Sequence, residues 1–176
     1  SFDETPYKKT NKKSKIFKDG GFMSLIGAGC NGLFRYPEFK FRPSQADLLH
    51  LDIMSDGVTI IRDGGSYSYN KGEEWMRYFS GIESHNTIQF DKSEQMPRLS
   101  RFLFGEWPKV KDYSFNNDSR STIVSAKYID HLGRSHERIV SVENRVWTII
   151  DKISGFSNCA ILRWRLDNSE WVIKDT

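Results

Sequence analysis

Short runs of alternating apolar and polar residues cover most of the chain. In segment 47–54, three apolar residues fall on one face and His50 and Asp52 on the other, which is typical of a half-buried β-strand. Further strand-like runs, rich in β-branched residues, occupy 22–29, 58–63, 85–91, 121–129, 137–153 and 160–167. A helical pattern is confined to GEEWMRYF, residues 72–79, which predicts about two turns.

Gly, Asn and Asp divide these runs at short intervals. The Asp56-Gly57 pair favours a tight turn with positive φ, so we expect segments 47–54 and 58–63 to form an antiparallel hairpin. That hairpin places Gln45 and Asp63 near the same sheet edge. Many short strands spaced by turns predict an all-β fold, an antiparallel β-sandwich of two stacked sheets in a supersandwich-like arrangement.

Composition and charge narrow the class of protein. The 176 residues are 38% hydrophobic, 14% aromatic and 28% charged, which suits one globular core, and no run approaches the roughly 20 apolar residues of a membrane span. Much of the net charge of +3 comes from lysines between residues 8 and 18. Since no arginine and only one aromatic residue, Phe17, lies among these lysines, we expect a basic, partly mobile segment 1–18 before a domain 19–176, and no nucleic-acid partner. Cys30 and Cys159 allow one disulfide or two buried thiols.

Two neighbouring segments, RDGGSYSYN and SHNTIQFD, gather side chains suited to binding. They are Asp63, Tyr67, Tyr69, His85 and Asn86. Asp63 is either a metal ligand or a carboxylate that orients the following glycine turn, and His85 is either a ligand or a hydrogen-bonded histidine at a strand end. For Tyr67 and Tyr69, burial with a satisfied hydroxyl is favoured over stacking against a sugar.

The order of four motifs resembles the C-terminal β-sheet domain of the heparinase II/III family of polysaccharide lyases. The family has an H-x-H-A-D segment, a D-x-G-x-Y-x-Y turn, an H-N-T strand and a D-x-x-x-Q element; this chain has PSQADLLHLDI, DGGSYSYN, HNTIQFD and DKSEQ. Lyases of the family carry an α/α toroid before this domain, and no segment here corresponds to it. The resemblance therefore implies an excised C-terminal domain whose partner is its own toroid.

The resemblance also implies a zinc site. Its second and third ligands fall on Asp63 and His85, but the first falls on Gln45, and the histidine before it falls on Pro43. An amide is a poor zinc ligand, so we expect any zinc site to be weakened. His50 is a candidate replacement, although a regular strand would direct it to the face opposite Gln45.

As function, the resemblance implies β-elimination on an anionic, uronic acid-containing polysaccharide. The acid and base would come from the toroid, so we expect the isolated domain to be inactive and to help form the substrate cleft. The expected sugar-binding residues are Tyr67, Tyr69, Arg77 and Asn86, unless Arg77 pairs locally with a glutamate of its own helix.

Other functions remain open. One alternative is a non-catalytic carbohydrate-binding or assembly module in bacterial exopolysaccharide metabolism, and another is a packing domain whose aromatic residues contact the toroid. A periplasmic or cell-envelope location is favoured for each.

Overall fold

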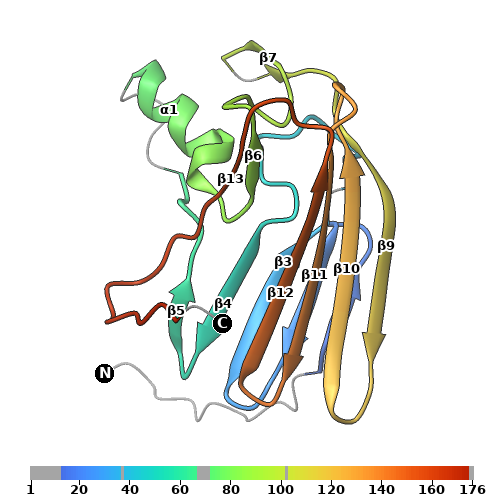
Figure 1. The fold of residues 1–176 in the computed structure, drawn as a ribbon, viewed down its shortest axis with the longest axis vertical. Coiled ribbons are helices and arrows are strands. Elements are labelled where there is room, and N and C mark those ends of the chain that lie inside the picture. Colours follow the sequence, from blue (N-terminus) through green and yellow to red (C-terminus); the bar gives the residue numbers. More distant parts are fainter. Residues whose placement is uncertain (1–12, 37, 67–71, 102, 175–176) are drawn as a thin grey trace, which may run out of the picture.

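In the computed structural model, residues 13–174 are described apart from 37, 67–71 and 102. Two antiparallel sheets stack face to face (Figure 1), which confirms the predicted β-sandwich. One sheet has five strands, in the order β1 (Lys15–Phe17), β2 (Phe22–Ile26), β3 (Cys30–Arg35), β4 (Leu51–Ser55) and β5 (Val58–Ile61). The other has four, in the order β12 (Val146–Ser154), β11 (Ser135–Glu143), β10 (Ser121–Ile129) and β9 (Lys109–Asn117).

Smaller elements gather at one end of the sandwich, opposite the turn between β4 and β5 (Figure 1). They are helix α1 (Glu73–Ser80), the 3-10 turn η1 (Ile82–Ser84), the pair β6 (Ile88–Phe90) with β13 (Ala160–Leu162), and the pair β7 (Arg98–Ser100) with β8 (Leu103–Phe104). None of the helices among the described residues is long and apolar enough to cross a membrane.

The core lies between the two sheets. Alternate residues of β2, β3 and β4 face those of β10 and β11, and the fully buried members include Met23, Leu25, Phe34, Leu51, Val124, Tyr128 and Val140. Burying each large apolar side chain contributes about 1.5–3 kcal/mol, so this layer is the main source of stability.

The predicted hairpin is confirmed, with one change at its start. Asp56 and Gly57 both have positive φ, 48° and 83°, and β4 pairs with β5 beside them. The first strand begins at Leu51, not at residue 47, because Leu49 has a φ of 59° and interrupts the extended backbone.

The two sheets lie close together at Gly32. A Cβ at this position would lie 2.6 Å from the indole of Trp147 on β12, so only glycine fits. Cys30 and Cys159 are free thiols, so the disulfide is not formed; Cys30 is buried as expected, whereas Cys159 is only partly buried. Of the predicted mobile segment, Lys15–Phe17 pair with β2 as part of the five-stranded sheet.

Candidate functional site

The carboxylate of Asp63 and the imidazole of His85 meet at the rim of the five-stranded sheet. Asp63 follows β5 and His85 follows η1, and Nδ1 of His85 donates to Oδ2 of Asp63 at 2.7 Å. The other oxygen of Asp63 accepts the backbone N–H of Gly65 at 2.5 Å. Asp63 therefore orients the glycine turn, as one of the two alternatives predicted, and also contacts His85; its role as a metal ligand stays a prediction.

His50 joins this pair, contrary to the expectation from strand alternation. Its Nε2 lies 3.4 Å from Oδ2 of Asp63, and the three groups lie within 4.8 Å of one another. His50 precedes β4, and the positive φ of Leu49 turns the chain there, so the side chain does not follow the strand period. We call His50, Asp63 and His85 the rim cluster.

Gln45, the position that the resemblance assigned to a first metal ligand, lies at the same edge. Its amide donates to Oγ of Ser66 at 3.5 Å, so the predicted proximity of this segment to the DGGS turn is confirmed. Tyr67 and Tyr69, predicted to bind sugar, lie outside the described residues.

The rim cluster is partly open to solvent on its carboxylate side. Asp52 and Asp63 line a hollow of about 270 Å³ on the outer face of β3–β5. Burial alone would raise the pKa of Asp63. The hydrogen bond and electrostatic attraction of His85, the attraction of His50 and the backbone hydrogen bond from Gly65 outweigh burial and hold the pKa below its usual value. Asp63 is therefore an anion at neutral pH.

Asn86, predicted to bind sugar, is fully buried and engaged by the backbone. Its side-chain N–H groups donate to the carbonyls of Leu51 and Arg62 at 2.9 and 3.1 Å, and its oxygen accepts from the N–H of Arg165 at 2.7 Å. A direct sugar contact would require these bonds to open, so the observed role of Asn86 is to join three segments.

Two further residues of the shared motifs, Thr87 and Gln95, hydrogen-bond to the backbone of the loop before β4. Thr87 donates to the carbonyl of Leu48 at 2.7 Å, and Gln95 of the DKSEQ element both accepts from the N–H of Leu48 and donates to its carbonyl. These side chains fix the loop that leads to His50.

Sequence reasoning missed Arg138, which lies directly behind the rim cluster. This fully buried residue on β11 donates through Nη1 to the carbonyl of Leu49 at 2.7 Å and to that of Asn86 at 2.5 Å. It also donates through Nε and Nη2 to the two oxygens of Asp151 on β12, at 2.7 and 3.1 Å. Its guanidinium lies 4.8 Å from the ring centre of Trp164.

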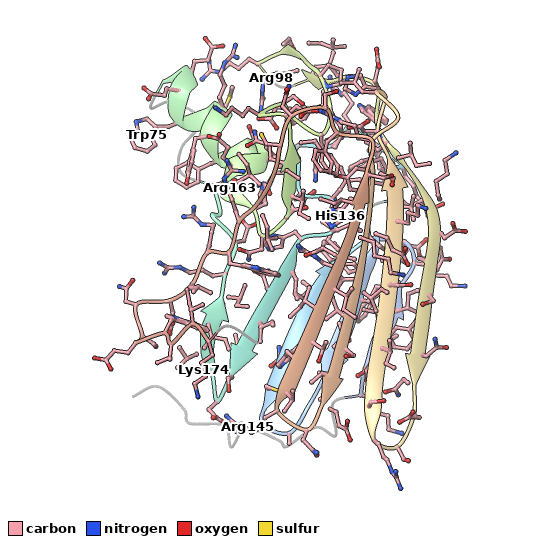
Figure 2. All side chains as sticks on the ribbon, viewed as in Figure 1. Trp75, Arg98, His136, Arg145, Arg163 and Lys174 are labelled. Carbon is pink, nitrogen blue, oxygen red and sulfur yellow. The ribbon has the colours of Figure 1, made fainter. Side chains whose placement is uncertain are left out.

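His136, also on β11, shares the carboxylate of Asp151. His136 is buried between the sheets (Figure 2), and its Nε2 lies 2.7 Å from Oδ1 of Asp151 on the neighbouring strand. Burial would raise the pKa of Asp151, but hydrogen bonds from His136 and Arg138 lower it to about 2. Burial lowers the pKa of His136, because it disfavours the charged imidazolium.

The residue types of the rim cluster suit zinc, but the hydrogen bonds of His50 do not. The backbone N–H of Asn86 donates to Nδ1 of His50 at 2.9 Å, so the neutral ring carries its proton on Nε2. That Nε2 faces Oδ1 of Asp52 at 3.0 Å. A metal-bound histidine instead donates from its second nitrogen. In this arrangement the rim cluster does not fit a zinc ion bound through His50.

On helix α1, Arg77 pairs with a glutamate of its own helix, which confirms the alternative to sugar binding. Arg77 donates to one carboxylate oxygen of Glu73 at 2.9 and 2.6 Å, four residues earlier on the exposed face. Trp75 projects outward from the same helix with about half of its surface exposed, at 49% (Figure 2). Together with Tyr78, Trp75 and Arg77 line a cavity of about 370 Å³.

Comparison with known proteins relates this β-sandwich to the polysaccharide lyases. The sequence profile described as "Heparinase II/III-like, C-terminal" matches residues 9–175. The chain therefore belongs to the heparinase II/III-like family, as its C-terminal domain. A search of curated proteins gave no match.

Solved structures share the fold. One titled "Heparinase III-BT4657 gene product" matches with a TM-score of 0.73 and 19% identity over 92% of this chain. The heparan sulfate lyase HepC mutant from Pedobacter heparinus matches with a TM-score of 0.70 and 17% identity over 90% of this chain. In each case the chain spans 25% of the length of the solved structure.

Proposed function

We propose that this domain forms one wall of the substrate cleft in a protein that acts on an anionic polysaccharide by β-elimination. The observation that carries the proposal is the family match, which extends over residues 9–175 and is accompanied by the fold of heparinase III structures. The partner of the domain is then an α/α toroid in the same protein, which supplies the opposite wall.

The surface beside α1 carries two side chains suited to an anionic sugar. The half-exposed indole of Trp75 offers a face for stacking, and the guanidinium of Arg77 offers a planar partner for a uronate carboxylate. Three glutamates, Glu74, Glu83 and Glu94, line the same cavity. Binding of a uronate there therefore depends on Arg77 exchanging Glu73 for the sugar.

In β-elimination a base removes the proton α to the uronate carboxylate, and the bond from C4 to the glycosidic oxygen breaks as a double bond forms. An acid must also protonate the departing oxygen. We assign neither role to a described residue, because His85 and Asn86 are fully buried and Asp63 is held by His85 and Gly65. The contribution of this domain is to bind and orient the chain of sugars.

The proposal is tested with the full-length parent by following the absorbance of the unsaturated uronate product. We expect Trp75→Ala and Arg77→Ala to raise KM about tenfold, since each removes about 1.4 kcal/mol of binding, while Trp171→Ala and Arg120→Ala, which alter exposed residues elsewhere, leave it unchanged. A parent that produces no unsaturated uronate from any acidic polysaccharide would contradict the proposed reaction.

A second function is favoured by the hydrogen bonding of His50 and by glutamine at position 45. A relative without the metal site of the resemblance could serve as a non-catalytic carbohydrate-binding or assembly module in bacterial exopolysaccharide metabolism. This alternative predicts that the full-length parent binds acidic oligosaccharides in calorimetry and never releases unsaturated ends.

A further inference from the structure

We propose that the rim cluster is assembled without a metal ion. Arg138 holds together the segments that carry the cluster, as a bound ion would otherwise do. The proposal does not rest on the proposed function, because it concerns only how His50, Asp63 and His85 are held together. It rests on the direction of the hydrogen bonds, the spacing of the ligand atoms and the contacts of Arg138.

Both nitrogens of His50 are already engaged. Nδ1 accepts from the backbone of Asn86 at 2.9 Å, and this donor cannot be reversed because an amide N–H only donates. Nε2 then carries the proton and donates to Asp52 at 3.0 Å. Binding a metal through Nε2 would require loss of that proton to give an imidazolate, and binding through Nδ1 would require the Asn86 bond to break.

The spacing between Asp63 and His85 is that of a hydrogen bond. Two atoms bound to one zinc ion at about 2.0–2.1 Å with tetrahedral angles lie about 3.3 Å apart. Oδ2 of Asp63 and Nδ1 of His85 are 2.7 Å apart, so a proton fits between them and a shared ion would have to separate them.

Arg138 holds the two histidine-bearing segments from behind. Its acceptors are the carbonyls of Leu49, which precedes His50, and of Asn86, which follows His85. Asp151 fixes the guanidinium through two further hydrogen bonds. One cation of the protein thus joins the loop before β4 to the loop before β6, and the adjacent histidines are brought together by this link.

The first experiment measures metal binding and histidine protonation in the purified domain. We expect no zinc after dialysis by mass spectrometry, no saturable heat on titration with zinc, and a melting temperature unchanged by EDTA. Nitrogen-detected NMR should show the proton of His50 on Nε2 and that of His85 on Nδ1, before and after zinc is added. One equivalent of zinc that is lost in both Asp63→Ala and His85→Ala would overturn the proposal.

The second experiment tests Arg138 against a matched control. Arg134 is equally buried, donates to Asp130 at 2.6 Å and to the carbonyl of Phe90 at 3.1 Å, and does not touch the loops of the rim cluster. Arg138→Lys should shift the side-chain signals of His50 and His85, whereas Arg134→Lys should leave them in place. If Arg138→Lys does not fold, Asp151→Asn provides the same readout with the arginine retained. Unchanged histidine signals in the folded variant would overturn the role of Arg138.

Discussion

The molecule contains the same chemical pair in two settings. His85 with Asp63 and His136 with Asp151 each place an imidazole nitrogen 2.7 Å from a carboxylate oxygen, and both histidine side chains have 0% exposure. The carboxylates differ: Asp63 is 29% exposed beside a hollow, whereas Asp151 is 12% exposed and also binds Arg138.

This difference separates a stabilising pair from a surface-accessible one. His136 and Asp151 lie on β11 and β12, in regular register, where an arginine neutralises the buried carboxylate. Asp63 and His85 lie in loops and meet solvent on the carboxylate side. Changes to the inner pair should therefore mainly alter the free energy of unfolding, and changes to the rim pair should alter the local surface.

The largest expected effect is that of Arg138→Met. Removing one partner of a buried ion pair leaves Asp151 and two backbone carbonyls without their donor, which costs about 3–5 kcal/mol. Urea unfolding followed by circular dichroism measures this loss. Arg145→Met, which breaks an exposed pair with Asp56, is the control and should change stability little. Equal effects of the two substitutions would contradict the assignment of Arg138.

Asp63→Ala should have a smaller effect than Arg138→Met. It leaves the buried N–H of His85 without an acceptor, which costs about 1–3 kcal/mol. Asp151→Ala should cost more, because it also strands Arg138. Urea midpoints for the two variants provide the comparison, and a larger loss for Asp63→Ala would reverse the ranking of the two pairs.

Acid should weaken the inner pair in two stages. The folded-state pKa of His136 lies below its unfolded value of 6.5, so its stabilising contribution is present above pH 6.5 and declines as pH falls below it. The folded-state pKa of Asp151 is about 2 against 3.8, so its contribution is present above pH 3.8 and is lost as pH falls toward 2.

Urea midpoints measured from pH 7 to pH 4 test the first stage. The variant His136→Gln should show a shallower loss of stability below pH 6.5 than the unmodified domain. An identical slope would exclude His136 as the group responsible.

The smallest effect should come from Asp52→Asn at the outer side of the rim cluster. The amide oxygen of asparagine still accepts from Nε2 of His50, and the position is one-third exposed, so we expect a change of about 0.5 kcal/mol or less. Thermal unfolding measures it. A loss as large as that of Asp63→Ala would show that Asp52 is an essential member of the cluster.

Much of the fold and part of the site could be predicted from local sequence. The Asp56-Gly57 turn fixed the hairpin, because positive φ at both positions is a property of those residues. The motifs also predicted correctly that Asp63 and His85 converge. The contribution of His50 could not be obtained from alternation, since it depends on the positive φ of Leu49, which is rare for a leucine.

A signal for Arg138 was present in the strand pattern. On β11, His136 and Arg138 are in phase with Val140 and Val142, and all four are buried. Charged residues in phase with core valines indicate a buried polar network. The acceptors in that network come from distant loops, however, and local sequence carries no information on which carbonyls Arg138 would reach.

Because Trp147 packs against the backbone of Gly32, its fluorescence can report on the separation of the two sheets. An indole pressed against a neighbouring sheet changes its emission when that sheet moves away. Fluorescence of Trp147, in a background where the other tryptophans are replaced, would therefore follow separation of the layers at the end remote from α1, independently of events at the rim.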